Sequence, residues 1–545
     1  MSKIAHYLQE HLLGEVTASA DARRYFSTDA SILTVTPALI AYPKNENDIR
    51  KTARFTWQLA ERGRVIAITA RGGGTDQSGA ALGSGIVLAF GAHMNRILEL
   101  DDKSGVVVVE PGANYGKLQQ ALHTHGRFLP PFPASLEYST IGGAVANNAC
   151  GEKSVKYGST RDYVRGLRVV LANGEVIETG RQTKKDLNKK LGLSTFEGEI
   201  YRAVDAMCEE SRELIEKSQP AVNSSAAGYA LADVKRRDGS LDLTPLFVGA
   251  QGTLGIITEV TLETEDYNPQ ATLLVANFDS LQKAQAAIIE LRNLSDMPSS
   301  IEMVDEHLLA LVDQLNPNLL KDVATKPYPK IMLFVELDTA GDRARSKMAK
   351  KAHRILSRQA TSVTAETEPD RQDELWKIRH AAAAAITRED KNTKSLPFME
   401  DGIVPPERFR EYLEGIYEIF ARNQLQAAVW GHAGDASLHA HPFLDLAQVG
   451  DRQKVFRMLE SYYDLIIRLG GSISNEHGDG RVRAPYLQKQ FSPEYYVLLQ
   501  KIKQIFDPYG TLNTGVKIDV KLDDIKPLLR TTYTLGRLHE HMPRS

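Results

Sequence analysis

Residues 65–79 read VIAITARGGGTDQSG, a β-branched run that passes directly into three consecutive glycines. Val65 to Thr69 is typical of a buried strand, and the loop from Arg71 to Gly79 brings several backbone N–H groups close together. Such a loop suits a pyrophosphate, although a single glycine-rich loop is more often only a tight turn. Its order matches neither GxxxxGK[ST] nor the GxGxxG that opens a Rossmann helix.

Further segments of small and polar residues strengthen the interpretation as a binding loop. Residues 130–151 read PPFPASLEYSTIGGAVANNACG, which packs poorly as a core and well against a flat polar ligand. The alternative is an irregular loop with a helix N-cap at Ser139 or Thr140. Residues 157–162 (YGSTRD) follow, and residues 249–258 (GAQGTLGIIT) form another glycine-rich turn that enters a strand. Several loops of this kind in one domain are unlikely by chance.

Hydrophobic periodicity divides the chain into two patterns. The first half alternates short apolar runs with helical stretches, which is typical of an α/β domain. It predicts strands at 65–69, 85–90, 106–110 and 167–171, a hairpin at Asn173-Gly174, and helices at 115–123 and 199–217. From Asn268, strands at 271–277, 300–304 and 330–337 alternate with helices at 280–294, from 306, and at 343–356. This second pattern predicts an open sheet with helices on one face, lying over the first domain as a lid.

Composition excludes several classes of protein. A chain of 545 residues is too long for one core, so we expect at least two domains. Lys and Arg total 66 against 69 for Asp and Glu, which gives no electrostatic reason to expect nucleic acid as a partner. Cys150 and Cys208 are the two cysteines, too few for a disulfide framework or a cysteine-held zinc or iron–sulfur cluster. Any iron–sulfur centre that accepts electrons must therefore sit on another polypeptide.

The ends of the chain predict no membrane span. The N-terminus, MSKIAHYLQEHLLGEV, indicates an amphipathic helix rather than a signal peptide, and no run approaches about 18 apolar residues. We expect a cytoplasmic protein, with peripheral contact to a membrane left open. The tail after Asp519 mixes Leu528, Leu529 and Leu535 with Arg530 and Arg537, and we expect a solvated terminal helix. Contact with a membrane surface or a partner is the alternative.

A cluster of histidines carries the strongest chemical signal. Residues 430–441 read WGHAGDASLHAH, and residues 470–480 read GGSISNEHGDG. Two imidazoles and a carboxylate are a common set for a catalytic divalent cation, with positions left open for substrate. His432 and His439 can converge if Gly434-Asp435 makes a tight turn between two strands. Histidines alone are more often residues without a metal, but Glu476 in the second segment makes a metal site the favoured interpretation.

Taken in order, these segments resemble the vanillyl-alcohol-oxidase, or PCMH-type, superfamily of FAD-binding proteins, in its branch of D-lactate, glycolate and D-2-hydroxyglutarate dehydrogenases. The resemblance runs from about Tyr42 to Ile518. It implies an α+β fold, with a PCMH-type FAD-binding domain of two α/β subdomains at 1–268. An α+β cap domain with an open antiparallel sheet and the metal site would occupy 269–504, and a segment at 505–545 would return to the FAD-binding domain.

The resemblance also implies site residues. FAD would be bound non-covalently, because no histidine, the residue of covalent attachment in some relatives, lies between Arg71 and Gly79. By likeness to GHxGDGNxH, the metal ligands are His432, His439 and Glu476, with His477 as catalytic base. Zinc is the first choice of metal, and Mn²⁺ or Fe²⁺ are alternatives. The residues implied to contact FAD are Arg71, Gly72, Gly73, Gly74, Thr75, Ser78, Gly79, Ser135, Thr140, Gly142, Gly143, Asn147, Asn148, Gly151, Asp162, Ile257 and Asn513.

Substrate contacts follow from the same resemblance. Arg379 and Lys394 match positions that hold substrate carboxylates, a task suited to a bidentate guanidinium. The alternative for Arg379 is a surface salt bridge, the usual fate of a helical arginine. Arg481 and Arg483 add positive charge and favour a dicarboxylate. Ala436 and Ser437 stand where the motif has glycine and asparagine, and His441 is unusual beside the site; these departures bear on the substrate rather than on the metal.

The expected activity is that of an FAD-dependent D-2-hydroxy acid dehydrogenase of the D-2-hydroxyglutarate or D-lactate type. A metal would polarise the substrate hydroxyl, His477 would take its proton, and the C2 hydride would pass to flavin N5. Electrons would go to an external acceptor, with an iron–sulfur protein or an electron-transfer flavoprotein as candidates, and a homodimer is left open. The alternatives are an oxidase that uses O₂, an alkyl-transferring synthase of the same fold, and a non-catalytic flavin subunit that relays electrons.

Overall fold

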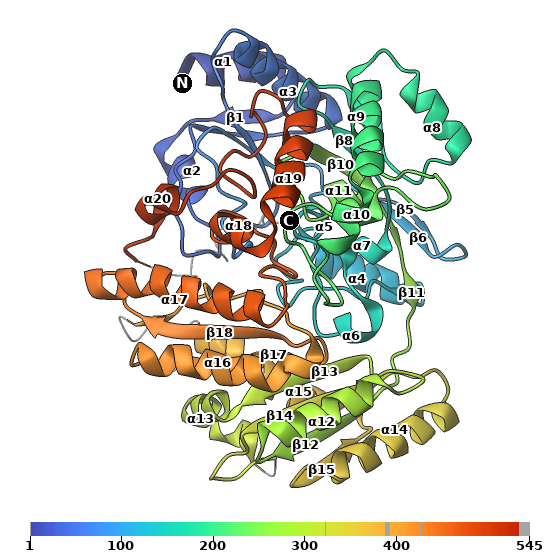
Figure 1. Cartoon of the computed structure of the whole chain (residues 1–545), viewed down its shortest axis with the longest axis vertical. Coiled ribbons are helices and arrows are strands. Elements are labelled where there is room, and N and C mark those ends of the chain that lie inside the picture. Colours follow the sequence, from blue (N-terminus) through green and yellow to red (C-terminus); the bar gives the residue numbers. More distant parts are fainter. Residues whose placement is uncertain (1, 322, 387–392, 426, 533–545) are drawn as a thin grey trace.

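The computed structural model describes residues 2–321, 323–386, 393–425 and 427–532. Figure 1 shows an N-terminal domain lying against a cap domain, with the last helices of the chain packed on the N-terminal domain. We use N-terminal domain for residues 2–266 and cap domain for residues 272–468. The predicted α+β fold with antiparallel sheets is confirmed.

The first sheet of the N-terminal domain has the order β1-β2-β4-β3 and contains the strands β1 Glu15–Thr17, β2 Leu39–Tyr42, β3 Ile68–Arg71 and β4 Ile86–Ala89. Strands β2 and β3 both run parallel to β4. Helix α3 (Glu46–Glu61) connects β2 to β3, as parallel strands require. The predicted strand at 65–69 is displaced: Val65 is exposed, and pairing with β4 begins at Ile68 and runs into the glycine loop.

The second sheet is antiparallel in the order β5-β6-β10-β8-β9. The hairpin predicted at Asn173-Gly174 is confirmed, because Val170 pairs with Val176 across it. The helix predicted at 199–217 is split at Ser211 into α9 and α10. The strands are β5 Ile97–Asp101, β6 Val106–Val109, β8 Val164–Val170, β9 Val176–Glu178 and β10 Ile256–Glu263, with a small pair β7 Arg127–Phe128 and β11 Glu265–Asp266. The other helices of this domain are α1 Ser2–His11, α2 Ala20–Tyr25, α4 Tyr115–Thr124, α5 Ile141–Asn147, α6 Ser154–Tyr157, α7 Thr160–Tyr163, α8 Lys184–Leu191, α9 Phe196–Glu210, α10 Arg212–Lys217 and α11 Thr244–Phe247.

The cap domain is built on an antiparallel seven-stranded sheet in the order β15-β12-β14-β13-β17-β18-β16. Its strands are β12 Thr272–Phe278, β13 Ser300–Asp305, β14 Ile331–Leu337, β15 Ser362–Glu366, β16 Lys394–Ser395, β17 Ala427–His432 and β18 Ser437–Leu444. Its helices are α12 Leu281–Arg292, α13 Glu306–Leu315, α14 Asp342–Ser357, α15 Pro369–Ile386, α16 Phe409–Arg422 and α17 Val449–Arg468.

Helices cover both faces of this sheet, so the prediction of helices on one face is wrong. Leu274 and Ala276 of β12 pack in one apolar cluster with residues of α12 and α14. Leu273 and Val275, which point the other way, pack with residues of α13 and α15. Strand β12 is apolar at nearly every position, and a strand of that kind must be covered on both sides.

The chain returns to the N-terminal domain earlier than the predicted residue 505. Helices α18 (Leu487–Gln490) and α19 (Pro493–Phe506) follow the cap domain, and Lys503 Nζ of α19 donates to Thr253 O at 2.8 Å. Leu512 then extends the first sheet by a bridge to Ile68 on β3. Lys517 Nζ lies 2.6 Å from Asp479 Oδ2, and both side chains are fully buried.

The tail that follows does not form the expected solvated helix within the described residues. After the short helix α20 (Leu522–Ile525), Leu529 bridges to Leu33, and Arg530 donates to the carbonyl oxygens of Leu33 and Asp29 at 2.9 and 2.6 Å. Leu535 and Arg537 lie outside the described residues. Among the helices that the structure describes, none combines the length and apolar character needed to cross a membrane.

The Lys517–Asp479 pair yields a stability prediction. Lys517→Met leaves the Asp479 carboxylate buried without a cation, and breaking a buried pair in this way costs about 3–5 kcal/mol. Denaturant unfolding should show this loss. The matched control is Lys526→Met, which removes a 2.9 Å pair with Asp523 at the surface and should leave the midpoint unchanged. Equal midpoints for the two variants would contradict the prediction.

Candidate functional site

The β17–β18 hairpin places two histidines on one face of the cap sheet. His432 pairs with Ser437 and Trp430 pairs with His439, and cross-strand partners project to the same side. The tight turn predicted at Gly434-Asp435 is confirmed, since residues 433–436 form the turn. Ala436 has φ +53°, the left-handed region that favours glycine, so this chain keeps a side chain where the motif has none.

The tip of this hairpin is anchored to the N-terminal domain. Asp435 Oδ2 accepts from Ser154 Oγ at 2.5 Å, and Oδ1 accepts from Asn223 Nδ2 at 2.6 Å. On the cap side, Arg292 Nη1 lies 3.3 Å from Asp435 Oδ1. The histidines therefore sit at the interface of the two domains.

The loop that carries Glu476 is held by a single carboxylate. The backbone N–H groups of Asn475, Glu476 and His477 donate to Asp401 at 2.9, 2.7 and 3.0 Å. Asp401 is buried and has φ +70°. Because three successive N–H groups converge on one side chain, the direction of Glu476 and His477 is fixed before any ligand binds.

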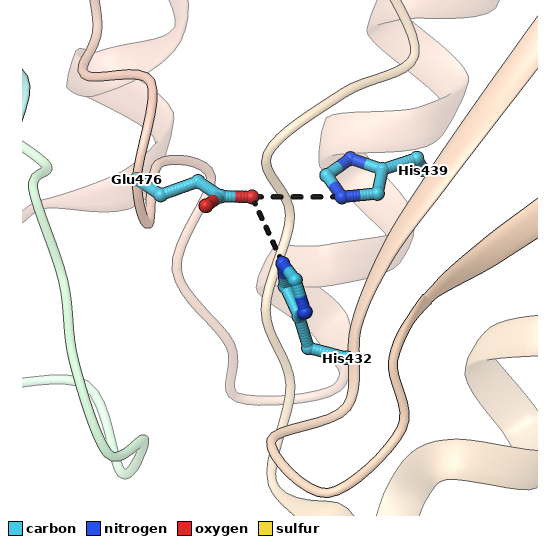
Figure 2. A group of neighbouring side chains, drawn as sticks. All are labelled: His432, His439 and Glu476. Atoms are coloured by element: carbon cyan, nitrogen blue, oxygen red, sulfur yellow. Dashed lines mark hydrogen bonds and ion pairs between the residues drawn. The ribbon is translucent and has the colours of Figure 1, made fainter. Parts of the chain in front are cut away.

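The structure brings together the three residues predicted as metal ligands (Figure 2). Glu476 Oε1 lies 3.3 Å from His432 Nε2 and 3.5 Å from His439 Nε2. Two ligand atoms that each lie about 2.0–2.1 Å from a tetrahedral ion are roughly 3.4 Å apart. The two distances from Glu476 therefore fit a zinc-sized cation, and all three ligand atoms lie within 4.8 Å of one another.

The opposite ring nitrogens of both histidines are bound by carboxylates. His432 Nδ1 lies 2.7 Å from Glu302 Oε1, and His439 Nδ1 lies 2.7 Å from Glu400 Oε2. An ionised carboxylate only accepts, so each Nδ1 carries a proton, and Nε2 is the nitrogen left to bind a cation once its own proton is lost. The resulting neutral ring is the tautomer that a metal ligand requires.

The buried charges around the triad do not balance. Four carboxylates and two guanidinium groups leave two negative charges if the imidazoles are neutral, and buried charge without compensation is costly. Burial disfavours the imidazolium form of His432. The carboxylates of Glu302 and Glu476 outweigh this effect of burial and raise the pKa of His432 well above the ordinary value. Burial opposes ionisation of Glu476, yet His432 and its neighbours lower that pKa to about 2. The site thus attracts protons or a divalent cation. The charged groups counted are Glu302, Glu400, Asp401, Glu476, Arg379 and Arg483.

The predicted base His477 lies beside the triad. Its Nε2 is 3.8 Å from Glu476 Oε1, and its Nδ1 is 3.6 Å from Glu400 Oε2. Nδ1 is buried and has no hydrogen-bond partner within the described residues, while 22% of the side chain is exposed. The catalytic role of His477 stays a prediction.

His441, the unusual residue beside the motif, belongs to the support of the site. Its Nε2 contacts Glu400 Oε1, and its ring meets the edge of Trp430 at 4.6 Å between centroids. Burial opposes ionisation of Glu400, but the imidazoles of His439 and His441 hold its pKa well below the ordinary value. Glu400 therefore holds two histidines at once.

Arg379 does not form the surface salt bridge considered from the sequence. It is buried, and its Nε and Nη2 lie 2.8 and 2.7 Å from the same oxygen of Glu302, Oε2. Two of its three nitrogens are already in use, so a bidentate grip on a substrate carboxylate would have to displace Glu302. Its contact with substrate stays a prediction, restricted to the remaining nitrogen.

Lys394 is not brought to the triad. It pairs with Leu444 of β18, five residues along the strand from His439, which is roughly 17 Å. Alternate residues of a strand point to opposite faces, so Leu444 and Lys394 lie on the face opposite to His439 and His441. A role for Lys394 in binding substrate stays a prediction that this register does not support.

Arg481 and Arg483 do not supply the open positive charge expected from the sequence. Arg481 donates to the carbonyl oxygens of Gly515, Leu82 and Thr514 at 2.8–2.9 Å. Arg483 Nη1 donates to Gly478 O at 2.9 Å, and the side chain is fully buried. Both guanidinium groups stabilise backbone, so the argument for a dicarboxylate substrate loses this support.

The glycine-rich loop after β3 has the features of a cofactor cradle. A Cβ at Gly72 or Gly73 would lie 2.1 Å from Thr140 Oγ1 or Tyr138 O, so the loop packs directly on residues 138–140. Within the described residues, the N–H groups of Gly73, Gly74 and Thr75 donate no hydrogen bond and can bind an anion. Three buried polar atoms nearby also have no partner in the described chain, namely Gln77 Oε1, Ser139 Oγ and Asn148 Nδ2. The residues present therefore fit a polar ligand such as FAD.

Several residues predicted to contact FAD have side chains committed to the protein. Arg71 donates to Thr28 O at 2.8 Å and lies over the ring of Phe26. Thr140 caps α5, as the alternative interpretation expected, and Asp162 caps α7 through Ser159. Asn513 uses both of its side-chain groups, because Oδ1 accepts from Thr69 and Nδ2 donates to Ala80 O and Gln251 O.

The remaining predicted positions lie in the glycine loop itself and in other parts of the N-terminal domain. Gly74 and Gly79 have positive φ, and Gly151 packs against the carbonyl oxygen of Phe132. Gly142 and Gly143 lie in α5, Ile257 is half-buried in β10, and Ser135 lies in a turn. Contacts of all these residues with FAD stay predictions.

Gln251 connects the glycine-rich loop after β3 to the loop that carries Glu476 and His477. Its Nε2 donates to Asn147 Oδ1 at 2.9 Å, to Ser78 Oγ at 3.0 Å and to His477 O at 3.1 Å. Its Oε1 accepts from Gly480 N at 2.7 Å. One side chain thus ties Asn147 and Ser78, both predicted cofactor residues, to the backbone of His477.

Sequence reasoning missed Glu302, Asp401 and Gln251 as site residues. For Glu302 a signal existed, because a single acid in the apolar run SIEMV is buried only if it is paired. Asp401 and Gln251 carry no comparable signal, since their roles depend on loops that meet only in the folded chain.

Comparison with known families supports a two-part organisation. Residues 37–180 match the model of an FAD binding domain, and residues 268–516 match the C-terminal domain of FAD linked oxidases. Two solved structures share the fold: 4-ethylphenol oxidase from Gulosibacter chungangensis (TM-score 0.68, 17% identity, 96% of this chain and 98% of that one) and p-cresol methylhydroxylase (TM-score 0.67, 14% identity, 96% and 97%).

Curated relatives are similar over most of the chain. D-2-hydroxyglutarate dehydrogenase of Escherichia coli K12 is 30% identical over 93% of this chain and 50% of its own length. Glycolate oxidase subunit GlcD of Bacillus subtilis is 29% identical over 88% of both chains, and D-lactate dehydrogenase of Archaeoglobus fulgidus is 27% identical over 92% and 96%. The chain spans about half the length of the D-2-hydroxyglutarate dehydrogenases that it matches.

Asp29, behind the glycine loop, yields a prediction of pH dependence. Burial raises its pKa from 3.8 to about 7, and the Asp76 carboxylate adds to this. A raised pKa means that the folded protein keeps the proton, so stability falls as pH rises from about 4 to 7 and is constant above. Asp29→Asn, which can still accept from Ser31, should match the parent near pH 4 and exceed it at pH 8.

The gain at pH 8 follows from the size of the shift. It should approach roughly 1.4 kcal/mol for each pH unit between 3.8 and 7. The measurement is denaturant unfolding of parent and variant at both pH values. A difference that stays constant between pH 4 and pH 8 would show that Asp29 is ionised throughout.

Proposed function

Since the chain belongs to the FAD-linked oxidases, we propose that it is an FAD-dependent dehydrogenase of a small D-2-hydroxy acid that uses a divalent cation at His432, His439 and Glu476. The observation that carries the proposal is the triad itself. Two imidazoles and one carboxylate converge, with Glu476 Oε1 3.3 and 3.5 Å from the two Nε2 atoms, and a third imidazole lies beside them. Relatives named D-2-hydroxyglutarate and D-lactate dehydrogenase support the substrate class.

When bound, FAD would supply a hydride acceptor and a divalent cation a Lewis acid for a hydroxyl oxygen, chemistry that side chains lack. Zinc is our first choice for the cation, because histidine nitrogens and one carboxylate are its common ligands, with Mn²⁺ or Fe²⁺ as alternatives. The cradle residues around Gly73–Thr75 would hold the FAD pyrophosphate through backbone N–H groups.

The chain's own residues orient substrate and move a proton. His477 would take the hydroxyl proton, because its ring lies beside the triad, with Nε2 3.8 Å from Glu476 Oε1. We expect Nη1 of Arg379, the nitrogen that Glu302 does not contact, to bind a substrate carboxylate. Asp401 holds the backbone of Glu476 and His477 in place during the proton transfer.

Electrons must then leave the flavin. The chain holds two cysteines, fewer than an iron–sulfur cluster needs, so we propose that the acceptor is a separate protein, either an iron–sulfur protein or an electron-transfer flavoprotein. An oxidase that uses O₂ is the second candidate, because some relatives are named glycolate oxidase subunits. Oxygen consumption by the reduced protein distinguishes the two.

Loss of the base gives the first functional prediction. His477→Ala should keep FAD bound and lower turnover with a D-2-hydroxy acid and an artificial dye by roughly 10²–10⁴-fold. The control is His353→Ala, since His353 lies on α14 away from the triad. Turnover by the His477 variant equal to the parent would remove His477 from the mechanism.

Removal of the cation gives the second functional prediction. Dialysis against a chelator should abolish turnover while the flavin spectrum persists, and added Zn²⁺ or Mn²⁺ should restore it. His432→Ala protein should be inactive before and after the same treatment. Activity that survives verified removal of metal would exclude the Lewis-acid role.

A further inference from the structure

Glu302 divides its two oxygens between two parts of the site. Oε1 lies 2.7 Å from Nδ1 of His432, and Oε2 lies 2.8 and 2.7 Å from Nε and Nη2 of Arg379. The carboxylate is fully buried at the centre of the cap sheet. The sheet register explains the first contact: Met303 pairs with Gly431, so Glu302 stands opposite His432 one step along β13 and β17.

We propose that Glu302 is a positioning residue that couples the ligand His432 to Arg379. The inference rests on the proposed metal centre. Glu302 accepts a hydrogen bond from the Nδ1–H group of His432. This bond fixes the orientation of the ring and leaves Nε2 as the nitrogen that can bind the cation. Arg379 acts on the metal through Glu302, because it holds the second oxygen of the carboxylate and thereby sets the direction of the first.

The other ligand histidine is supported in a different way. Met399 bridges to Ala440, so Glu400 stands opposite His439 in the same manner that Glu302 stands opposite His432. Glu400, however, shares its other oxygen with His441 rather than with a guanidinium group. Of the two supporting glutamates, Glu302 is the one that links a metal ligand to an arginine predicted to bind substrate.

The chemistry of an amide makes the proposal testable. A carboxylate offers acceptors on both oxygens, whereas glutamine offers one acceptor oxygen and one donor NH₂ group. In Glu302→Gln, the oxygen can face His432 Nδ1 or Arg379, but the NH₂ group must then face a donor. The variant cannot satisfy both partners, although its size is unchanged.

The experiment measures metal affinity rather than turnover. FAD-loaded protein stripped of metal is titrated with Zn²⁺ in competition with a chromophoric chelator. Glu302→Gln should bind Zn²⁺ roughly 10–100-fold more weakly than the parent, the usual effect of removing a group that orients a ligand. Glu336→Gln is the matched control, because Glu336 lies on the neighbouring strand β14 and contacts Lys153 and Ser299 instead of the triad.

A double variant separates positioning from a merely structural role. In Glu302→Gln with Arg379→Leu, no guanidinium competes for the amide oxygen, so it can accept from His432 Nδ1 and part of the affinity should return. A buried ion pair that only stabilised the fold would give a double variant that binds Zn²⁺ as weakly as Glu302→Gln, or more weakly. Glu302→Asp, which keeps the charge but shortens the reach, should also weaken binding if Glu302→Gln does not fold.

The outcomes distinguish this inference from the proposed function. Parent protein whose Zn²⁺ affinity is unchanged by His432→Ala would overturn the metal centre, and the inference with it. If the parent binds through His432 but Glu302→Gln binds equally well, only the inference fails. Weaker binding by Glu302→Gln together with recovery in the double variant supports it.

Discussion

The site depends on the hydrogen bonds that the carboxylate of Asp401 accepts from the backbone of residues 475–477. Three consecutive backbone N–H groups and the hydroxyl of Ser474 converge on it, and these bonds set the path of the loop that carries Glu476 and His477. Charge-assisted hydrogen bonds of this kind are about twice as strong as neutral ones. The predicted ligand Glu476 and the predicted base His477 are adjacent in sequence, and they can face one site only if their backbone is held rigidly; Asp401 holds it from a different segment of the chain.

Around this loop, the site is assembled from pieces that no single domain contains. The histidines come from a hairpin of the cap domain, whose tip is held by Ser154 and Asn223 of the N-terminal domain. Gln251 connects the cradle to the carbonyl oxygen of His477. The excess of buried carboxylates is tolerable only because cations and imidazoles lie within the same cluster. The two domains are therefore linked through the site itself, by polar groups that must all be satisfied together.

Much of the fold and the ligand set could be predicted because their signals are local. Apolar runs predicted three of the seven cap strands, β12, β13 and β14, to within a residue, and the spacing of His432 and His439 was compatible with a hairpin if Gly434-Asp435 made a tight turn. What failed depends on register and on contacts between distant segments. The apolar character of strand β12 is itself a signal for covering on both faces, but which helices supply the second cover depends on contacts between distant segments. The register that pairs Lys394 with Leu444 is likewise not visible in the sequence. Arg379 was recognised, but its partner Glu302 lies 77 residues away in sequence.

The way the C-terminal segment completes the first sheet has a consequence for biosynthesis. Strand β3 is at the edge of that sheet until Leu512 pairs with Ile68, and Asn513 closes on Thr69 across 444 residues of sequence. At roughly 5–20 residues per second, a ribosome needs about 20–90 s to synthesise that stretch. During that interval the nascent chain exposes an open strand edge beside the unfinished cradle, a hazard for pairing with other chains. Correct assembly therefore requires that this edge stays unpaired with other chains until residues 512–513 have been synthesised.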